Sequence, residues 1–510
     1  MNEISNQSAN RERPHYRPIL RIGGLILLSC AVIGAFLAAI FSGPRSPERF
    51  AEWQDPQGQR RSLMIAGKHA IVAGTPWAAD AGFAMLEAGG TACDAAVSAV
   101  LMLNVTFSEA ASFPGIAPAL VYDGATGRMR SYVGVGVAPA RATIDLFRER
   151  GYSEAVPKNS ILAQLVPASP DVLTTLLRDC GSRSFSEAVA PAIERARDGF
   201  PVHRTMLKNF ELPLYKRFGF AMILPYNAEV FLNGEWWRPL HHKDEFRLPD
   251  LASTLEELSA AERAAYANPE RGYASEAERQ AGLAAVRDYF YAGPIAEKIV
   301  AFHEREGGLL QAADLSEYRG EYEEPLTMDL GGFRFSTNRT WTQGIVVLQT
   351  LQILAGFDLR GMGHNSHEYI HTEAPAIALA KADREAFAGD PRPGFTPRPV
   401  PVERLISPEY AAVRRALMTP GVAFGKTPPA GDPFADPVKQ EDESEVRGAE
   451  SAYARDAFQS SEAAVASRDN FATGWPDLAQ LMPVDFAPGY GEAGRDTSNV
   501  SVIDRQGNAV

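Results

Sequence analysis

The stretch D-T-S-N-V-S-V-I-D-R-Q-G-N-A-V, residues 496–510, carries the most information about the fold of this chain. Residues 500–503 favour a strand because most of them are β-branched. Gln506, Gly507 and Asn508 favour a turn. Two hydroxyl residues, Thr497 and Ser498, come shortly before the strand. The stretch therefore predicts a hairpin that starts just after a threonine.

Upstream of this stretch, helix and strand signals are mixed along the chain. Thr75-Pro76 predicts a helix start, because a hydroxyl cap precedes a proline at the first helical position. Gly89-Gly90 predicts where that helix ends, and Asp94 is expected to cap the next one. The mixture indicates an α/β or α+β class. The expected elements are helices at 77–88, 95–103, 185–196, 295–305, 345–354 and 369–387, and a strand at 119–122.

Several segments resemble the gamma-glutamyltransferase (gamma-glutamyltranspeptidase) family, and they occur in the family's order. Residues 88–97 (AGGTACDAAV) are similar to the family element GGNAxDAAVA, and residues 191–202 (PAIERARDGFPV) to PAIxLARDGFPV. Residues 496–510 resemble TTHxSVVDxxGNAV. Weaker similarities fall at 66–76, 290–296, 314–318, 344–359 and 369–391.

The resemblance implies an N-terminal-nucleophile hydrolase with a four-layer αββα sandwich. Thr497 falls on the family's nucleophile, and the precursor would cut its own bond between Asp496 and Thr497. The freed α-amine of Thr497 could then act as the base for its own hydroxyl. The implied substrate is a small gamma-glutamyl compound such as glutathione, or another acyl amide. The acyl group would pass through an ester to water or an amino acid. No cofactor or metal is implied.

Three departures from the family pattern concern substrate recognition. The family places an arginine, suited to pairing with a carboxylate, where this chain has Val135. The glycine-rich family segment is altered at residues 111–118. A further family motif is replaced at residues 340–344, which include Trp341 and Gln343. These changes put gamma-glutamyl recognition in question and favour, as an alternative, an acylase-like branch on the same machinery.

The end of the chain is a further departure. The family's small subunit, with which the large subunit pairs, is much longer than the fourteen residues 497–510. We expect an open sheet edge and an unpaired core face at this hairpin. A fragment, a split protein completed by another chain, and an inactive membrane-tethered pseudoenzyme all remain possible explanations, and we favour the fragment.

The N-terminus predicts a membrane anchor. Residues 22–41 carry no charge, and at about 1.5 Å per residue such a helix crosses the bilayer core of about 30 Å. Four arginines precede it, so the positive-inside rule places residues 1–21 in the cytoplasm and the catalytic region outside, in the periplasm or the extracellular space. A cleaved signal peptide is the alternative.

The remaining organisation follows from composition. Residues 42–63 are expected to be a linker and 64–496 the large-subunit region, with 419–496 a flexible pre-cleavage segment rich in proline and acidic residues. The net charge of −13 argues against a nucleic-acid partner. Of the three cysteines, Cys30 lies in the apolar run, while Cys93 and Cys180 could pair only with each other. The sequence leaves that pairing open.

Overall fold

The computed structural model describes residues 68–157, 160–232, 234–392, 398–435 and 498–510. The predicted tail (1–21), anchor (22–41) and linker (42–63) lie outside these ranges, as do Asp496, Thr497 and residues 436–496 of the pre-cleavage segment. Within the described ranges, no helix has both the length and the hydropathy that a bilayer crossing requires. The described residues fall into two compact units, 202–244 in one and the rest in the other.

The main sheet of the larger unit contains the two ends of the described chain. Strand β1 (Ala70–Val72) pairs antiparallel with β9 (Ser501–Ile503), with Ile71 opposite Val502. Ala509 bridges to Ile503 on one side and to Tyr122 on the other. It thereby joins this pair to the strands β2 (Ala119–Asp123), β3 (Arg128–Tyr132) and β6 (Tyr322–Glu323), which are antiparallel in that order.

The terminal hairpin is therefore not at an open edge of the sheet, and that expectation was wrong. The backbones of Val502 and Val510 exchange two hydrogen bonds, at 2.8 and 3.1 Å, and those of Tyr122 and Ala509 exchange two more, at 2.8 and 3.0 Å. The hairpin lies between β1 and β2, because its first arm, β9, pairs with β1 and its second arm, at Ala509, pairs with β2.

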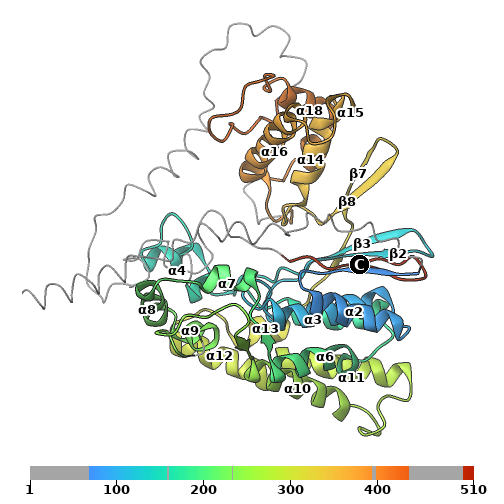
Figure 1. Ribbon diagram of the computed structural model, residues 1–510, viewed down its shortest axis with the longest axis vertical. Coiled ribbons are helices and arrows are strands. Elements are labelled where there is room, and N and C mark those ends of the chain that lie inside the picture. The colour runs from blue at the N-terminus through green and yellow to red at the C-terminus, as the bar shows by residue number, and fades with distance from the viewer. Residues whose placement is uncertain (1–67, 158–159, 233, 393–397, 436–497) are drawn as a thin grey trace, which may run out of the picture. The chain divides into compact units, whose positions relative to one another are not determined.

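Helices α2 (Pro76–Glu87) and α3 (Ala92–Thr106) cover one face of this sheet (Figure 1). Val502 is buried against Leu86, Ala92, Ala95 and Ala96. The small side chains of α3 allow this close approach, and α3 is buried along almost its whole length. Further helices pack beyond α3: α5 (Ser169–Cys180), α6 (Phe185–Asp198), α10 (Pro249–Ala264) and α11 (Glu276–Tyr291).

The start of α2 agrees with its prediction, whereas the start of α3 does not. Thr75 caps α2, accepting from the N–H of Ala78 at 3.3 Å, and Gly89 follows the helix with φ of +83°. For α3 the cap is Thr91, three residues before the predicted cap Asp94, and Asp94 sits in the first turn as the reciprocal member of a capping box. The aspartate was correctly linked to the helix start but was placed at the wrong position.

The other predicted helices are present with small shifts at their ends. Residues 185–196 lie in α6, residues 295–305 in α12 (Pro294–Glu306), 345–354 in α14 (Gly344–Leu354) and 369–387 in α16 (His367–Phe387). The remaining elements are α4 (Ile144–Glu149), η2 (Ile161–Ala163), β4 (Phe200–Pro201), β5 (Glu245–Phe246), α13 (Ala312–Glu317), β7 (Leu326–Leu330), β8 (Phe333–Thr337), α15 (Leu359–Met362), α17 (Val402–Leu405) and α18 (Pro408–Arg415).

A buried ion pair joins the helices α16 and α18. Asp383 lies 3.1 Å from Arg414 and also accepts from the backbone N–H of Gly431 at 2.8 Å. Gly431 belongs to the segment 419–435, which is the described part of the predicted flexible region. This part has no helix or strand and is mostly exposed, but the contact with Asp383 ties it to the helices.

The smaller unit, residues 202–244, is helical. It contains α7 (Arg204–Phe210), α8 (Leu214–Ile223) and α9 (Pro225–Phe231) (Figure 1). Its internal packing includes the stacked rings of Phe210 and Phe231, whose centroids are 4.8 Å apart.

Candidate active site

The predicted nucleophile, Thr497, lies outside the described residues, so the site is described from its neighbour Ser498 onward. The hydroxyl oxygen of Ser498 is buried and has no hydrogen-bond partner among the residues that the structure describes. Gly74 lies directly against it. A side-chain carbon at Gly74 would overlap Ser498 Oγ and lie 3.3 Å from Ser498 Cβ. Only glycine therefore allows the chain just after Thr497 to approach this closely.

The backbone around Gly74 is held in place by two threonines. Thr75 Oγ1 lies 2.8 Å from Thr106 Oγ1, and the Thr106 hydroxyl donates to the carbonyl of Met102 at 2.9 Å. Since Thr75 also caps α2, this short chain of hydrogen bonds joins the start of α2 to the end of α3. Both helices thereby hold in place the backbone at Gly74, against which Ser498 lies.

Asp504 organises the turn of the hairpin. It is buried, and one of its oxygens accepts from the N–H groups of Gln506 and Asn508 at 2.9 and 3.0 Å. The other accepts from the side-chain amide of Asn508 at 2.9 Å and from the N–H of Ala92 at 3.1 Å. Ala92 is the first residue of α3, where a negative charge is favoured by the helix dipole. The hairpin is thus fixed to a helix N-terminus.

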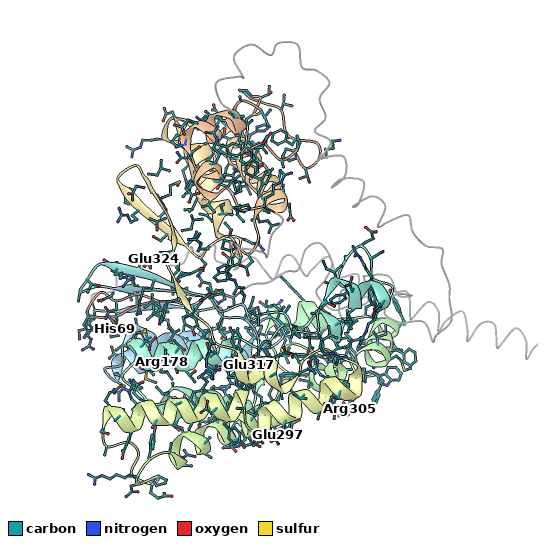
Figure 2. The ribbon with its side chains drawn as sticks, turned by 180° about the vertical axis from the view of Figure 1, so that it is seen from behind. His69, Arg178, Glu297, Arg305, Glu317 and Glu324 are labelled. Atoms are coloured by element: carbon teal, nitrogen blue, oxygen red, sulfur yellow. A yellow bond between two sulfur atoms is a disulfide. The ribbon has the colours of Figure 1, made fainter. Side chains whose placement is uncertain are left out.

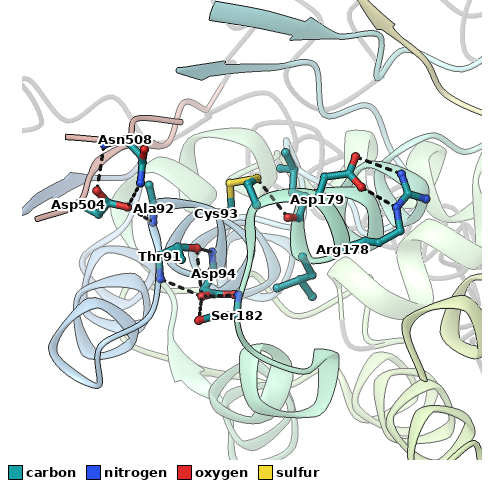
Figure 3. Close-up of a disulfide and its surroundings, with 12 residues drawn as sticks. Thr91, Ala92, Cys93, Asp94, Arg178, Asp179, Ser182, Asp504 and Asn508 are labelled. Atoms are coloured by element: carbon teal, nitrogen blue, oxygen red, sulfur yellow. Dashed lines mark hydrogen bonds and ion pairs between the residues drawn. A yellow bond between two sulfur atoms is a disulfide. The ribbon is translucent and has the colours of Figure 1, made fainter. Parts of the chain in front are cut away.

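The first turn of α3 also binds a loop on its other side (Figure 3). Asp94 accepts from the N–H of Ser182 at 2.9 Å and from its hydroxyl at 2.8 Å. Cys93 forms a disulfide with Cys180 at the end of α5, with the Cα atoms 5.8 Å apart. The pairing that the sequence left open is therefore formed, and it cross-links the helix that carries the hairpin.

A second set of contacts joins β1, α2 and the turn. His69 Nε2 lies 2.8 Å from Glu87 Oε1, and Arg505 lies 3.9 Å from the same carboxylate. Figure 2 shows His69 beside the strands. Arg505 also donates to His69 Nδ1 at 3.5 Å. These contacts are long or partly exposed, so we regard them as supporting the hairpin rather than anchoring it.

Val135, at the family's arginine position, is half-buried in the loop that follows β3. Glycines flank it. Gly134 accepts from the N–H of Ala117 at 2.8 Å, and a side chain there would collide with Ala117. Gly136 has φ of +76° and lies against the carbonyl of Val166. The two segments that depart from the family pattern, 111–118 and the Val135 loop, therefore lie side by side.

A buried network supports the end of β3 just before this loop. Tyr132 donates to Asp171 at 2.6 Å, and Arg287 donates to the same carboxylate at 2.8 Å. Burial and then the Asp171 charge raise the pKa of the Tyr132 hydroxyl, so it remains a donor. The Arg287–Asp171 pair therefore supports the end of β3 through Tyr132 and takes no part in the hairpin contacts described above.

Trp341, the other predicted determinant of specificity, is half-buried and attached to the same strand. Its Nε1 donates to Glu323 at 2.8 Å, and Glu323 accepts from the Ser131 hydroxyl at 3.1 Å. Asn338 also donates to Ser131, at 2.9 Å. Val135 thus follows β3 directly and Trp341 is linked to β3 through Glu323, a proximity that no sequence pattern predicted.

Two residues of the site were quoted in the motifs but were given no role. Asp504 was part of the family similarity at residues 496–510, and Gly74 was part of the similarity at residues 66–76. A buried aspartate before a Gly-Asn turn is a signal that could have suggested its function. In the described ranges, no group of three or more His, Cys, Asp or Glu residues is arranged to hold a metal ion.

The chain is similar in sequence to a known protein family and to several of its members. A family model described as gamma-glutamyltranspeptidase matches residues 78–510. The glutathione hydrolase proenzyme of Bacillus subtilis strain 168 is 29% identical over 418 residues, which are 80% of this chain and 63% of that protein. The acylase ACY 1 proenzyme of Pseudomonas sp. strain V22 is 30% identical over 361 residues, 68% of this chain and 58% of that protein.

A solved structure shows the same likeness. The gamma-glutamyltranspeptidase from Pseudomonas nitroreducens complexed with L-DON is 26% identical, with a TM-score of 0.56, and the match covers 72% of this chain and 99% of that one. The chain spans less than two thirds of the length of the two curated relatives.

Proposed function

The chain belongs to the gamma-glutamyltranspeptidase family, and on that premise we propose that it is the precursor of an N-terminal-nucleophile enzyme that transfers gamma-glutamyl groups to water or an amine. The relatives named as glutathione hydrolases support glutathione-like substrates. The observation that carries the proposal is the close fit of Ser498 to Gly74 at the start of an anchored hairpin. The residue before Ser498 is Thr497.

Self-cleavage is the first step of the proposal. The Thr497 hydroxyl adds to the carbonyl carbon of Asp496, the peptide C–N bond breaks, and an ester with a free α-amine results. Water then hydrolyses the ester, which leaves a carboxylate on Asp496 and a hydroxyl on Thr497. The hairpin contacts of Ser498 and Asp504 hold the strand still while the preceding chain separates.

Turnover uses the same hydroxyl. The α-amine of Thr497 accepts its proton as the hydroxyl attacks the substrate amide, the amine product leaves with that proton, and an acyl ester remains. Water or an amino acid then takes the acyl group and restores the hydroxyl. The proposal requires no metal or cofactor.

Mass spectrometry of the protein expressed from its complete reading frame tests self-cleavage. We expect two polypeptides with the second beginning at Thr497, and a single uncut polypeptide for Thr497→Ala. Ser498→Ala is the matched control, because it removes a neighbouring hydroxyl and should still be cut. An uncut wild type that has the same mass as Thr497→Ala would overturn the proposal.

A second candidate, an acylase of different specificity, is favoured by Val135. A valine offers no charged hydrogen bonds to a substrate carboxylate, and such contacts contribute about 1.5–3 kcal/mol. The acylase-named relative has similar identity to this chain. Hydrolysis of a gamma-glutamyl anilide and of simple acyl anilides should be compared for wild type and Val135→Arg. Preference for the simple anilides, shifted by the arginine toward the gamma-glutamyl compound, would support the acylase.

For the compartment, we propose a single-pass anchor at residues 22–41 with the catalytic region outside the cytoplasm. The Cys93–Cys180 disulfide supports this, since disulfides persist in oxidising compartments. N-terminal sequencing of the mature protein tests the anchor, which requires the encoded N-terminus to be retained. A start near residue 43 would contradict it and indicate a cleaved signal peptide.

A further inference from the structure

The smaller unit exposes several large apolar side chains, and some of their rings pack together. Phe218 and Met222 lie one turn apart on α8 and are 48% and 63% exposed. The Phe218 ring packs against Trp236, with centroids 5.1 Å apart, and Trp236 packs against Trp237, which is 58% exposed. We call Phe218, Met222, Trp236 and Trp237 the aromatic patch. Contiguous exposed apolar surface of this kind marks an interaction site.

A buried arginine contacts the backbone of the aromatic patch. Arg217 is only 6% exposed, and its Nη2 makes a long contact of 3.4 Å with the carbonyl of Trp237. Its Nε and Nη1 are buried, and among the described residues they have no hydrogen-bond partner. Burial lowers the pKa of Arg217, and no carboxylate in the described part of the chain opposes this effect. A guanidinium without an anion is costly to bury, so this one is poised for an anionic partner.

The charge of the segment points to the same class of partner. Residues 202–244 contain six lysines and arginines against four aspartates and glutamates, whereas the whole chain has a net charge of −13. A basic segment with exposed tryptophan, phenylalanine and methionine has the composition of an element that lies in a membrane interface. Tryptophan is favoured there because its ring is apolar and its N–H is polar.

We propose that the aromatic patch docks onto a bilayer that contains anionic phospholipid, with Arg217 binding a lipid phosphate. The rings of Phe218 and Trp237 enter the headgroup region. The long side chain of Arg217 leaves its weak contact with the Trp237 carbonyl and extends to the phosphate, as arginines do at interfaces. A basic surface gains further from the negative potential of such a membrane. The proposal requires neither self-cleavage nor the N-terminal anchor.

Quenching of tryptophan fluorescence by brominated lipid tests the docking. The full chain is mixed with vesicles of phosphatidylcholine and phosphatidylglycerol, brominated or plain, and the emission of Trp237 is obtained as the difference between wild type and Trp237→Phe. We expect brominated vesicles to remove most of that emission. The matched control is Trp341→Phe, because Trp341 is hydrogen-bonded to Glu323 in the other unit, and its difference emission should be unchanged.

The headgroup contact is tested with Arg217→Gln. Quenching of Trp237 should be stronger with phosphatidylglycerol than with phosphatidylcholine alone in wild type, and this difference should be lost in the variant. Circular dichroism of the variant establishes that it is folded. An equal response of wild type and folded variant to phosphatidylglycerol would overturn the role of Arg217.

Three other results would overturn the docking itself. The first is unquenched Trp237 emission in every brominated vesicle. The second is self-association of the chain, measured by sedimentation and abolished by Phe218→Ser, which would identify a second copy as the occupant. The third is an increase in melting temperature with inorganic phosphate alone that depends on Arg217, without quenching in vesicles, which would identify a site for a free anion.

Discussion

The carboxylate of Asp504 accepts a hydrogen bond from the backbone N–H of Ala92 at 3.1 Å, although the two residues are 412 apart in sequence. Through this bond the last turn of the described chain is attached to the first residue of α3. The same carboxylate orders the turn around Asn508. The strand that follows the predicted nucleophile therefore depends on a helix N-terminus.

Replacement of Asp504 should destabilise the protein. In Asp504→Ala the N–H groups of buried Ala92 and half-buried Asn508 lose their charged acceptor, and we expect a loss of about 2–3 kcal/mol in the free energy of unfolding. Urea unfolding followed by circular dichroism measures this loss. The control is Asp145→Ala, an exposed aspartate in the first turn of α4, which should cost less than about 1 kcal/mol. Equal losses for the two variants would contradict the anchoring role.

Gly74 and Ser498 should be energetically coupled. Gly74→Ala forces its new methyl group onto Ser498, and overpacking of this kind costs about 1–3 kcal/mol. Ser498→Ala removes the overlapping oxygen, which has no hydrogen-bond partner, so it should be nearly neutral alone and should partly rescue Gly74→Ala. Unfolding free energies and self-cleavage rates of the two single variants and the double variant measure the coupling. Strictly additive effects would show that the close approach has no energetic consequence.

The disulfide should contribute to stability. It closes a sequence separation of 87 residues between α3 and α5, and loss of such a cross-link typically costs about 2–5 kcal/mol. Reductant should therefore lower the melting temperature of wild type and leave that of Cys93→Ala/Cys180→Ala unchanged. Titration of thiols in the unfolded, unreduced protein should detect Cys30 alone. Detection of all three cysteines under these conditions would refute the pairing.

His303 should make the protein sensitive to mild acid. Its side chain is buried, and burial lowers the pKa of the imidazole below the ordinary value of 6.5. As the pH falls through 6.5, the unfolded chain takes up a proton that the folded chain does not, so stability falls with pH. The uncharged Nδ1 also accepts from the N–H of Leu310 at 3.4 Å, which a protonated ring cannot do.

The comparison of two asparagine variants tests this effect. His303→Asn should make the melting temperature less dependent on pH below 6.5 than it is in wild type. His242→Asn changes an exposed histidine and should leave the pH dependence as it is in wild type. If the melting temperature of His303→Asn depended on pH as it does in wild type, the buried imidazole would be ruled out as the cause of the acid sensitivity.

Much of the local structure could be predicted because its causes are local. Thr75 and Pro76 specify the start of α2 with atoms only three residues apart, and Gly89 ends it with a positive φ that glycine adopts readily. The strand and the turn of the hairpin follow from β-branched residues and Gly507. The motifs around Thr497 identified the family for the same reason, since each is a short continuous segment.

The α3 cap shows where local inference failed. Asp94 is a good capping residue by type, but Thr91 has the extended backbone of the cap position. Asp94 instead bonds with Ser182, 88 residues away. Thr91 and Asp94 could each have capped this helix by residue type, and the folded backbone has Thr91 at the cap position.

The sequence by itself determined six of the helices, the terminal strand and turn, the family and the position of the predicted nucleophile, because these depend on residues close together in the chain. Only the tertiary structure decided that the hairpin lies between β1 and β2, that Cys93 pairs with Cys180, and that Asp504 binds Ala92. Each of these joins segments distant in sequence, and which distant groups meet depends on the packing of the whole core rather than on any short pattern. The tertiary structure also decided that the aromatic patch is exposed. Phe218 and Trp237 are residue types that are usually found in a core, and only the fold leaves them at the surface.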